Sequence, residues 1–319
     1  FVDLNILPLI EEASKSFNSV KAIVIMTGKK NIIDLNLPNN IETLCYEEFI
    51  ENESDDFDWP ELDERTASSL CYTSGTTGNP KGVLYTHRST VLHAFGVNLK
   101  DAIPYGSKDC VLPVVPMFHA NAWGFAHAAV ATGATIVMPG ADLSAPSLAD
   151  IIETEKVTVA AGVPTIWMGV LPELEGKDVS ALRAIPCGGS AVPKALSEGF
   201  REATGLPILQ AWGMTETSPL AAVCSIKSTL DHLSIEEKAD LRTSIGLISP
   251  GVDFRIADDE TDEEQPWDGE SRGELQVRGP WVAREYYNDA RANESFTADG
   301  WLKTGDVATC DSEGYIRLV

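Results

Sequence analysis

Residues 110–115 read Cys-Val-Leu-Pro-Val-Val and open the stretch, from about 109 to 212, that determines the fold class. Short apolar runs rich in β-branched residues recur along it, each beside glycine or proline, and helix-length amphipathic segments separate them. Strands that alternate with helices are typical of a parallel sheet covered by helices. We therefore predict an α/β fold with mainly parallel sheets, whose strands lie at 110–115, 135–138, 157–160 and 207–210.

One of the intervening helices has clear boundary signals. Ser144 is a residue type that caps helix N-termini, and Pro146 would lie in the first turn. Apolar residues then follow at spacings of three and four, including Leu148 and Ile152. The pattern predicts a helix whose apolar stripe packs on the sheet.

The pattern changes after residues 234–242, which we expect to form a surface helix. Short strands separated by turns follow, and they indicate a smaller β-rich, barrel-like subdomain. We predict two domains, an α/β nucleotide- and acyl-binding core at 1–238 and the β-rich subdomain at 239–319. Because residue 1 is Phe rather than Met and residues 315–319 stop within a predicted strand, we interpret the sequence as part of a longer chain.

The composition is that of a globular protein, with 44% hydrophobic residues in 319 and a mean hydropathy of −0.05. No apolar run reaches the roughly 18–20 residues that span a bilayer, and the first residues do not resemble a secretory signal, so we expect a cytoplasmic protein without an integral membrane segment. A net charge of −24 disfavours nucleic acid and anionic membranes as partners. The acidic clusters at 51–58 and 258–264 are interpreted as solvated loops. The six scattered cysteines have neither zinc-ligand nor disulfide spacing, and we expect them to be reduced.

The strongest functional signal is the run Tyr72-Thr-Ser-Gly-Thr-Thr-Gly-Asn-Pro-Lys-Gly82. Glycines let backbone N–H groups approach phosphate oxygens, hydroxyls add donors, and a lysine adds positive charge. The run is not the GxxxxGK[ST] loop of P-loop NTPases, because Pro80 stands five residues after Gly75 and a strand is predicted from residue 82. A flexible surface loop is the alternative. The predicted phosphate-binding residues are Thr73, Ser74, Gly75, Thr76, Thr77, Gly78 and Lys81.

Together with this run, five segments resemble the adenylate-forming superfamily of acyl-CoA synthetases, luciferases and peptide-synthetase adenylation domains. They occur in the family's order at residues 116–124 (Pro-Met-Phe-His-Ala-Asn-Ala-Trp-Gly), 188–191, 210–216 (Gln-Ala-Trp-Gly-Met-Thr-Glu), 273–280 and 301–306.

The His-x-Asn-Ala-Trp-Gly form and residues 162–167 are most similar to bacterial medium- and long-chain fatty-acyl-CoA synthetases. This resemblance implies that ATP activates a carboxylic acid as acyl-AMP, with Mg²⁺, and that coenzyme A then takes the acyl group. Ligases for short, sulfur-containing or aromatic acids share these motifs, as do carrier-protein acylating ligases and luciferase-like enzymes. A non-catalytic nucleotide- or acyl-binding module is a further alternative.

The resemblance also implies roles for individual residues in nucleotide binding. Trp212 stands where the family usually has tyrosine and would stack on the adenine, although any contact that needs a phenol oxygen is lost. Thr215 would lie beside the α-phosphate, and Asp306 would accept hydrogen bonds from the ribose hydroxyls. Glu216 would bind Mg²⁺ with Thr73 as a second contact. The remaining adenine-site residues implied are Gly188, Gly189, Ser190, Gln210, Ala211 and Gly213.

Around the acid, the resemblance implies that His119 flanks the reacting carboxylate and that Trp123 and Gly213 border the acyl pocket. For His119 and Trp123 the alternatives are a structural histidine and a packed core tryptophan. Lys81, Thr215, Glu216 and His119 are the implied catalytic group. Family members continue beyond residue 319 into a hinge and a mobile C-terminal domain, so we expect these 319 residues alone to adenylate poorly. Family relatives often dimerise, and a homodimer is possible here.

Overall fold

The computed structural model describes residues 1–32, 35–38, 40–73, 80–289 and 294–319. The chain divides into two compact units, Phe1–Leu62 and Asp63–Val319. The predicted boundary after residue 238 lies inside the second unit, where one hydrophobic cluster holds Trp212 and Ala222 together with Ile256 and Leu302. That boundary stays a prediction, drawn from the change of sequence pattern.

The first unit is a small α/β element. Parallel strands β1 (Ala22–Ile25) and β2 (Glu42–Cys45) pair in register, with Ala22 opposite Glu42. Helices α1 (Leu7–Ser14) and α2 (Tyr46–Ile50) accompany them, with short 3-10 helices η1 (Leu4–Ile6) and η2 (Lys29–Asn31). A cluster of four buried side chains forms its core, namely Leu7, Ile23, Ile25 and Ile41.

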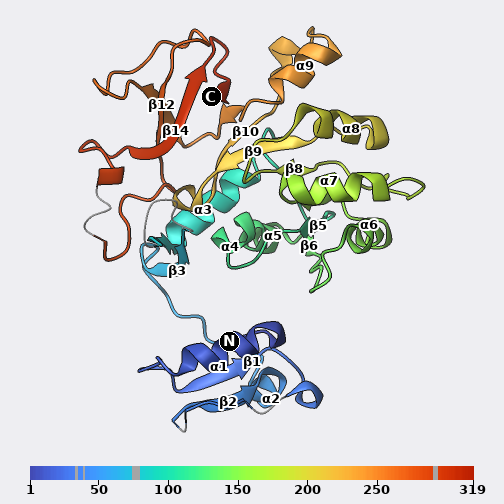
Figure 1. The fold of residues 1–319 in the computed structure, drawn as a ribbon, viewed down its shortest axis with the longest axis vertical. Helices are drawn as coiled ribbons and strands as arrows, with labels where there is room; N and C mark the ends of the chain where they lie inside the picture. Colours follow the sequence, from blue (N-terminus) through green and yellow to red (C-terminus); the bar gives the residue numbers. More distant parts are fainter. Residues whose placement is uncertain (33–34, 39, 74–79, 290–293) are drawn as a thin grey trace. The chain divides into compact units, whose positions relative to one another are not determined.

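The second unit is built on a run of parallel strands, as predicted (Figure 1). Strand β5 (Cys110–Pro113) pairs in parallel with β6 (Thr135–Ile136) and with β7 (Val159–Ala161). Isolated parallel bridges continue from β7 to β8 (Pro186–Cys187), which pairs with β9 (Leu209–Gly213). Antiparallel strands β10 (Leu220–Val223) and β11 (Leu247–Ile248) complete this layer.

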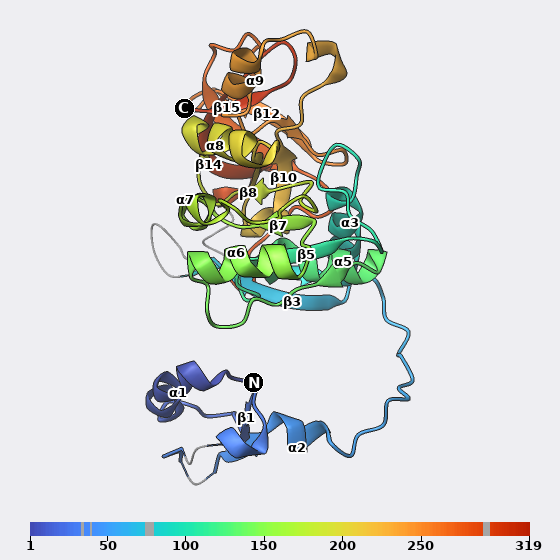
Figure 2. The ribbon, with the colours of Figure 1, turned by 90° about the vertical axis from the view of Figure 1, so that its right-hand side faces the viewer.

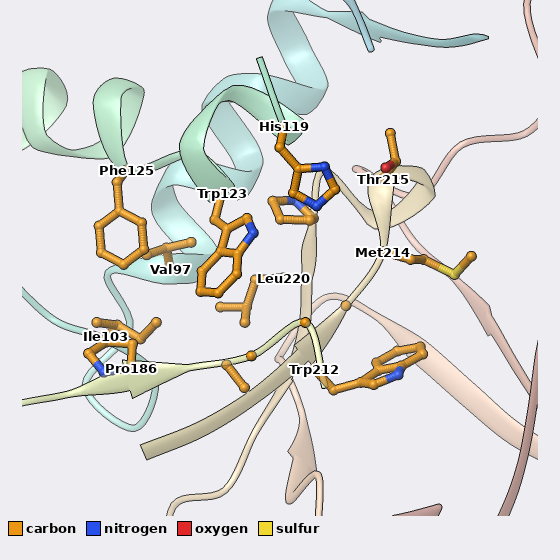
Figure 3. Close-up of a pocket in the computed structure, with 15 residues that line it drawn as sticks. Val97, Ile103, His119, Trp123, Phe125, Pro186, Trp212, Met214, Thr215 and Leu220 are labelled. Carbon is orange, nitrogen blue, oxygen red and sulfur yellow. The ribbon is translucent and has the colours of Figure 1, made fainter. Parts of the chain in front are cut away.

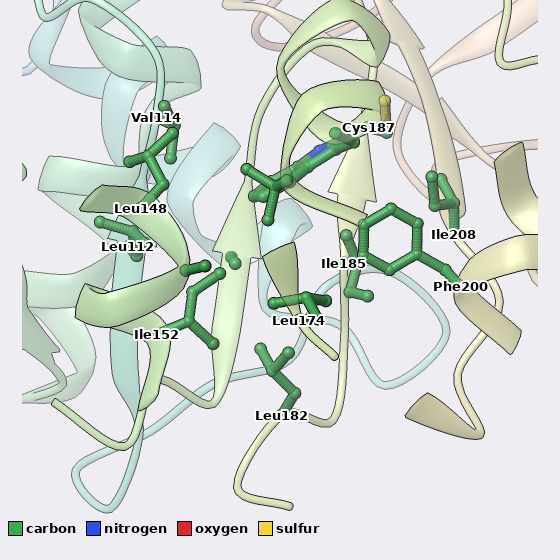
Figure 4. Close-up of a cluster of buried hydrophobic side chains, with 14 of the residues drawn as sticks. Leu112, Val114, Leu148, Ile152, Leu174, Leu182, Ile185, Cys187, Phe200 and Ile208 are labelled. Carbon is green, nitrogen blue, oxygen red and sulfur yellow. The ribbon is translucent and has the colours of Figure 1, made fainter. Parts of the chain in front are cut away.

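Helices cover both faces of the parallel strands. Successive strand residues point to opposite faces, so Leu112 and Ala160 pack with helices α6 (Ala145–Thr154), α7 (Pro164–Glu173) and α8 (Lys194–Thr204), as Figure 4 shows for part of this cluster. On the other face, Val111 and Val159 pack with α3 (His87–Val97) and α5 (Phe125–Thr132). Burial on both sides explains why these strands are apolar throughout rather than alternating.

Several strand and helix ends differ from the predicted ones for local reasons. Strand β7 begins at Val159 rather than 157, because the Val157 N–H donates to Ile152 O at the end of α6. Helix α6 does begin after Ser144, but the Ser144 hydroxyl makes no capping hydrogen bond. Helix α9 (Ile235–Leu241) has the expected place, and Ser234 caps it with Glu237 as a capping box.

The C-terminal part of this unit is the predicted β-rich region, an antiparallel sheet in the order β12-β13-β14-β15. Figures 1 and 2 both show β12 and β14 close to α9 at one end of the unit. The bounds are β12 (Asp253–Ala257), β13 (Gly273–Arg278), β14 (Leu302–Cys310) and β15 (Ile316–Leu318), and short 3-10 helices η3 (Thr215–Thr217) and η4 (Ser228–Leu230) precede α9.

The strands that flank the predicted phosphate loop form an antiparallel hairpin, β3 (Ala67–Tyr72) and β4 (Gly82–Thr86), with Tyr72 opposite Gly82. The acidic clusters at 51–58 and 258–264 are largely exposed, in accord with solvated loops. All six cysteines are unpaired, and five of them are buried. Among the described residues, no helix combines the length and the apolar character that crossing a membrane requires.

Candidate functional site

A pocket lies at the carboxyl ends of the parallel strands, where α/β proteins commonly bind ligands. His119 follows β5, Gly188 follows β8, residues 211–213 end β9, and Met214 and Thr215 follow it. In Figure 3, His119 and Thr215 lie on one side of the pocket and Val97, Ile103 and Phe125 on the other. The structure thus brings predicted acyl-site and nucleotide-site residues to one cavity, whose side with Val97, Ile103 and Phe125 is apolar.

A left-handed turn carries Trp123 into this pocket. Helix α4 (Ala120–Trp123) has positive φ at all four of its residues, from 47° at Ala120 to 57° at Trp123. Such a run is unusual for residues other than glycine. The Asn121 amide secures the turn by donating to Ser69 Oγ at 2.9 Å, and Ser69 belongs to β3. The strained turn points Trp123 toward Phe125 and Leu220 (Figure 3).

Close approach of neighbouring backbone requires glycine at two motif positions. A Cβ at Gly213 would lie 1.8 Å from Pro219 O, and one at Gly188 would lie 2.7 Å from Ala211 O. The strand ends can therefore pack closely only without side chains at these positions. The ring of Trp123 lies beside Gly188, because a Cβ at Gly188 would be 3.7 Å from that ring.

Trp212 and Asp306, which are 94 residues apart, contact each other directly. The indole Nε1–H of Trp212 donates to Asp306 Oδ2 at 2.9 Å. The indole is 9% exposed and points away from the apolar side chains of the pocket (Figure 3). The predicted adenine-stacking and ribose-binding residues therefore form one unit, with the indole N–H holding the carboxylate.

Thr215 and Glu216 are both buried, and tyrosines hold them. Tyr85 Oη donates to the Thr215 carbonyl at 2.6 Å, and Tyr286 Oη donates to Glu216 Oε1 at 2.5 Å. Burial raises the pKa of both tyrosines above the usual value, so both remain donors at neutral pH. Neither tyrosine was assigned a role from the sequence, because both lie outside the motif segments.

The donor set around Glu216 fits a magnesium site that nucleotide oxygens complete. No described residue donates to Glu216 Oε2, so one carboxylate oxygen is available to a cation. Within the described part of the chain, no group of three or more His, Cys, Asp or Glu side chains could hold a metal ion. Mg²⁺ is commonly held by one or two carboxylates, substrate phosphates and water rather than by an all-protein cage.

The ends of the predicted phosphate loop are joined. The Thr73 N–H donates to Lys81 O at 2.9 Å, and the Lys81 N–H donates to Thr73 Oγ1 at 3.3 Å. The Lys81 ammonium lies 4.7 Å from the centre of the Tyr286 ring and donates to Ser295 Oγ at 3.4 Å. The other predicted loop residues, Ser74, Gly75, Thr76, Thr77 and Gly78, lie outside the described residues.

Several predicted nucleotide-site residues do not line the pocket, namely Thr73, Lys81, Ser190, Gln210 and Asp306. The Gln210 side chain is buried, and its Oε1 accepts from the Val192 N–H at 3.2 Å. Ser190 is exposed beyond the turn after β8. Adjacent to the pocket, His93 is 2% exposed, and its Nε2 accepts from the Leu220 N–H at 3.0 Å. Burial lowers the pKa of His93 to about 3, so it is a neutral structural histidine that holds β10.

Comparison with known proteins identifies the family. Residues 10–287 match the AMP-binding enzyme family. The chain belongs to this family. The 3-methylmercaptopropionyl-CoA ligase of Ruegeria pomeroyi is 44% identical over 321 residues, which cover 100% of this chain and 58% of the relative. The medium-chain-fatty-acid–CoA ligase of Ectopseudomonas oleovorans is 42% identical over 319 residues. The aligned region covers 99% of this chain and 57% of the relative.

Solved structures of a CoA ligase and a CoA synthetase share the fold. The anthranilate CoA ligase in complex with anthranoyl-AMP superposes with a TM-score of 0.81 at 24% identity, over 99% of this chain and 57% of that one. The o-succinylbenzoate CoA synthetase of Bacillus subtilis, in complex with ATP and magnesium ion, gives 0.75 at 26% identity, over 98% of this chain and 60% of that one. The chain therefore spans less than two thirds of the length of these relatives.

Proposed function

We propose that this chain provides the nucleotide- and acid-binding part of an AMP-forming acyl-CoA ligase. The observation that supports this most directly is the pocket at the carboxyl ends of β5, β8 and β9. Its apolar wall, with Trp123 and Phe125, suits the tail of an acid, and His119 and Thr215 lie at the side where a carboxylate would meet a nucleotide. Family membership supports the same reaction class.

The proposed chemistry has two balanced steps. A carboxylate oxygen attacks the α-phosphorus of ATP, the bond to the β-phosphate oxygen breaks, and pyrophosphate leaves with that electron pair. The coenzyme A thiolate then attacks the acyl carbonyl, and AMP leaves. We assign phosphate binding to Lys81, ribose binding to Asp306 and metal binding to Glu216 with Thr73. Magnesium, when bound, would neutralise phosphate charge, and catalysis would rest on positioning and charge stabilisation.

For the acid, we propose a monocarboxylic acid with an apolar tail, in first place a medium- or long-chain fatty acid. His119 is the sole ionisable side chain among the described residues that line the pocket, and a second carboxylate would be unpaired there. A short sulfur-containing acid is the second candidate, because two 3-methylmercaptopropionyl-CoA ligases are each 44% identical to this chain.

Calorimetric titration of the chain tests the proposal. The ligands would be Mg-ATP and hydrolysis-resistant acyl-adenylate analogues with octanoyl, palmitoyl, 3-(methylthio)propanoyl, benzoyl and malonyl groups. We expect tight binding of an analogue with an unbranched apolar tail, weak binding of the malonyl analogue, and loss of most affinity in Asp306→Ala and Lys81→Ala.

The rank order of the analogues decides between the two acids. Preference for the octanoyl or palmitoyl analogue would support a fatty acid, and preference for the 3-(methylthio)propanoyl analogue would support the second candidate. If folded protein binds neither Mg-ATP nor any analogue, the chain is not a functional adenylate-binding unit and the proposal fails.

A further inference from the structure

Tyr286 belongs to the segment between β13 and β14. This segment is hydrogen-bonded to two parts of the proposed nucleotide site. The Ala283 N–H donates to Glu216 O at 2.7 Å, and the Tyr287 N–H donates to Gly82 O at 2.8 Å. Backbone hydrogen bonds therefore hold Tyr286 between the motif at 215–217 and the end of the phosphate loop. Its side chain is 6% exposed and packs with Cys71, Val83 and Tyr85.

The Tyr286 side chain contacts two of the charged groups proposed for catalysis. Its Oη donates to Glu216 Oε1 at 2.5 Å, and its ring centre lies 4.7 Å from Lys81 Nζ. A hydroxyl that donates to one carboxylate oxygen fixes the plane of the carboxylate. An ammonium over an aromatic face gains electrostatic attraction, which is larger where water is excluded.

Tyr85 is a natural comparison for Tyr286. Both tyrosines are buried in the same cluster, and both hydroxyls donate to the same short motif. The Tyr85 hydroxyl, however, bonds the backbone carbonyl of Thr215, whereas the Tyr286 hydroxyl bonds the side-chain carboxylate of Glu216. Loss of either hydroxyl removes a buried hydrogen bond, but only loss of the Tyr286 hydroxyl frees a charged group of the proposed metal site.

We propose that Tyr286 is a positioning residue of the nucleotide site. Its hydroxyl turns the Glu216 carboxylate so that Oε2 is the oxygen presented to a divalent cation, and its ring holds the Lys81 ammonium near the phosphate loop. One side chain thus couples the orientation of the metal-binding carboxylate to the position of the phosphate-binding lysine. This inference rests on the proposed function of the chain.

The test compares three variants, Tyr286→Phe, Tyr286→Leu and Tyr85→Phe. Each is titrated with a non-hydrolysable ATP analogue at a series of Mg²⁺ concentrations. Electron paramagnetic resonance measures the binding of Mn²⁺ separately. In Tyr286→Phe, we expect the cation concentration for half-maximal nucleotide binding to rise about threefold to tenfold, with little change at saturating cation. Tyr286→Leu also loses the ring, so it should bind the analogue more weakly even at saturating cation. Tyr85→Phe should lose similar stability in urea unfolding but keep the cation dependence of the wild type.

The Glu216→Gln variant gives a second test of the inference, which does not rest on Tyr286→Phe alone. If Tyr286 acts through Glu216, adding Tyr286→Phe to Glu216→Gln should cause no further change in cation dependence. The inference is overturned if Tyr286→Phe leaves the cation dependence unchanged, or if Tyr85→Phe shifts it equally, while wild-type protein binds the Mg²⁺ complex. Failure of the folded wild type to bind the nucleotide at any cation concentration would overturn the proposed function, and this inference with it.

Discussion

Trp212 shows what a single exchange at a motif position can change. A tyrosine there would offer a ring for stacking, and the indole adds an N–H that reaches Asp306 Oδ2 at 2.9 Å. This hydrogen bond orients the carboxylate, and in the proposed nucleotide site Oδ1 would be the oxygen that a ribose hydroxyl meets. From the sequence we expected only the loss of a phenol contact, because the partner is far away in the chain.

Trp212→Phe should weaken binding of an acyl-adenylate analogue by about threefold to tenfold, because stacking is kept while the hydrogen bond to a charged group is lost. Calorimetric titration measures the change. Trp267→Phe is the matched control, since Trp267 is 43% exposed and stacks on Phe254 away from the pocket. Equal affinities of Trp212→Phe and wild type would show that the indole N–H has no part in ribose binding.

His93 makes stability depend on pH. Its native-state pKa is lowered to about 3 by burial, whereas an unfolded histidine has a pKa of about 6.5. Between these values the unfolded chain binds the proton and the native chain does not, so the contribution of His93 is full above pH 6.5 and is lost as the pH falls. Glutamine at this position could still accept from the Leu220 N–H without titrating.

Between pH 7 and pH 5, wild type should therefore lose about 2 kcal/mol more of its free energy of unfolding than His93→Gln does. Urea unfolding followed by circular dichroism at the two pH values measures this difference. Equal losses of unfolding free energy in wild type and His93→Gln would mean that His93 is protonated in the native state or does not titrate in the unfolded state.

At the scale of elements, the left-handed turn of α4 is the most strained piece of regular structure in the site. A non-glycine residue in this conformation costs roughly 1–2 kcal/mol, and here four occur in succession. Neighbouring elements hold the turn. The Asn121 amide donates a hydrogen bond to Ser69 Oγ, and Ala120 and Ala122 are buried. The turn joins His119 to Trp123, and both residues line the pocket.

Glycine substitution tests this strain directly. Ala122→Gly relieves positive φ, whereas Ala128→Gly removes an equally buried methyl group from ordinary helix α5. We expect Ala122→Gly to be more stable than Ala128→Gly by about 1–2 kcal/mol in urea unfolding. Equal destabilisation of the two variants would contradict a left-handed turn at this position.

At the scale of the whole molecule, the chain consists of two units of unequal size. All predicted site residues that the structure describes belong to the unit Asp63–Val319, and the unit Phe1–Leu62 has a separate core. Residues 51–62, at the C-terminal end of the first unit, are exposed and carry Phe57 and Trp59 in edge-to-face contact with a centroid distance of 5.0 Å. Exposed irregular chain of this kind is where proteases cleave first.

Limited digestion with a glutamate-specific protease should therefore cut first at Glu51, Glu53 or Glu61 and leave a stable fragment that ends at Val319. Mass spectrometry identifies the cut. The purified fragment should bind the acyl-adenylate analogue within about tenfold of the intact chain. Early cleavage inside the second unit, or complete loss of binding by an otherwise folded fragment, would contradict the division.

The fold class and the family could be recognised from the sequence because their signals are local. Apolar strands such as β5 and β7 are read from consecutive residues, and the motifs at 72–82 and 210–216 are contiguous. Element ends were less predictable, as β7 shows, because backbone hydrogen bonds to a neighbouring element decide where pairing begins.

The sequence by itself therefore determined the α/β architecture, the β-rich C-terminal region and the membership of the chain in the AMP-binding enzymes. Only the tertiary structure decided which atoms meet: Trp212 with Asp306 across 94 residues, Tyr286 with Glu216 across 70, and Lys81 with Ser295 across 214. The physical reason is that a periodic pattern reports the environment of a residue, buried or exposed. The partner of a polar group depends on how distant strands and loops pack, and no spacing in the sequence encodes that packing.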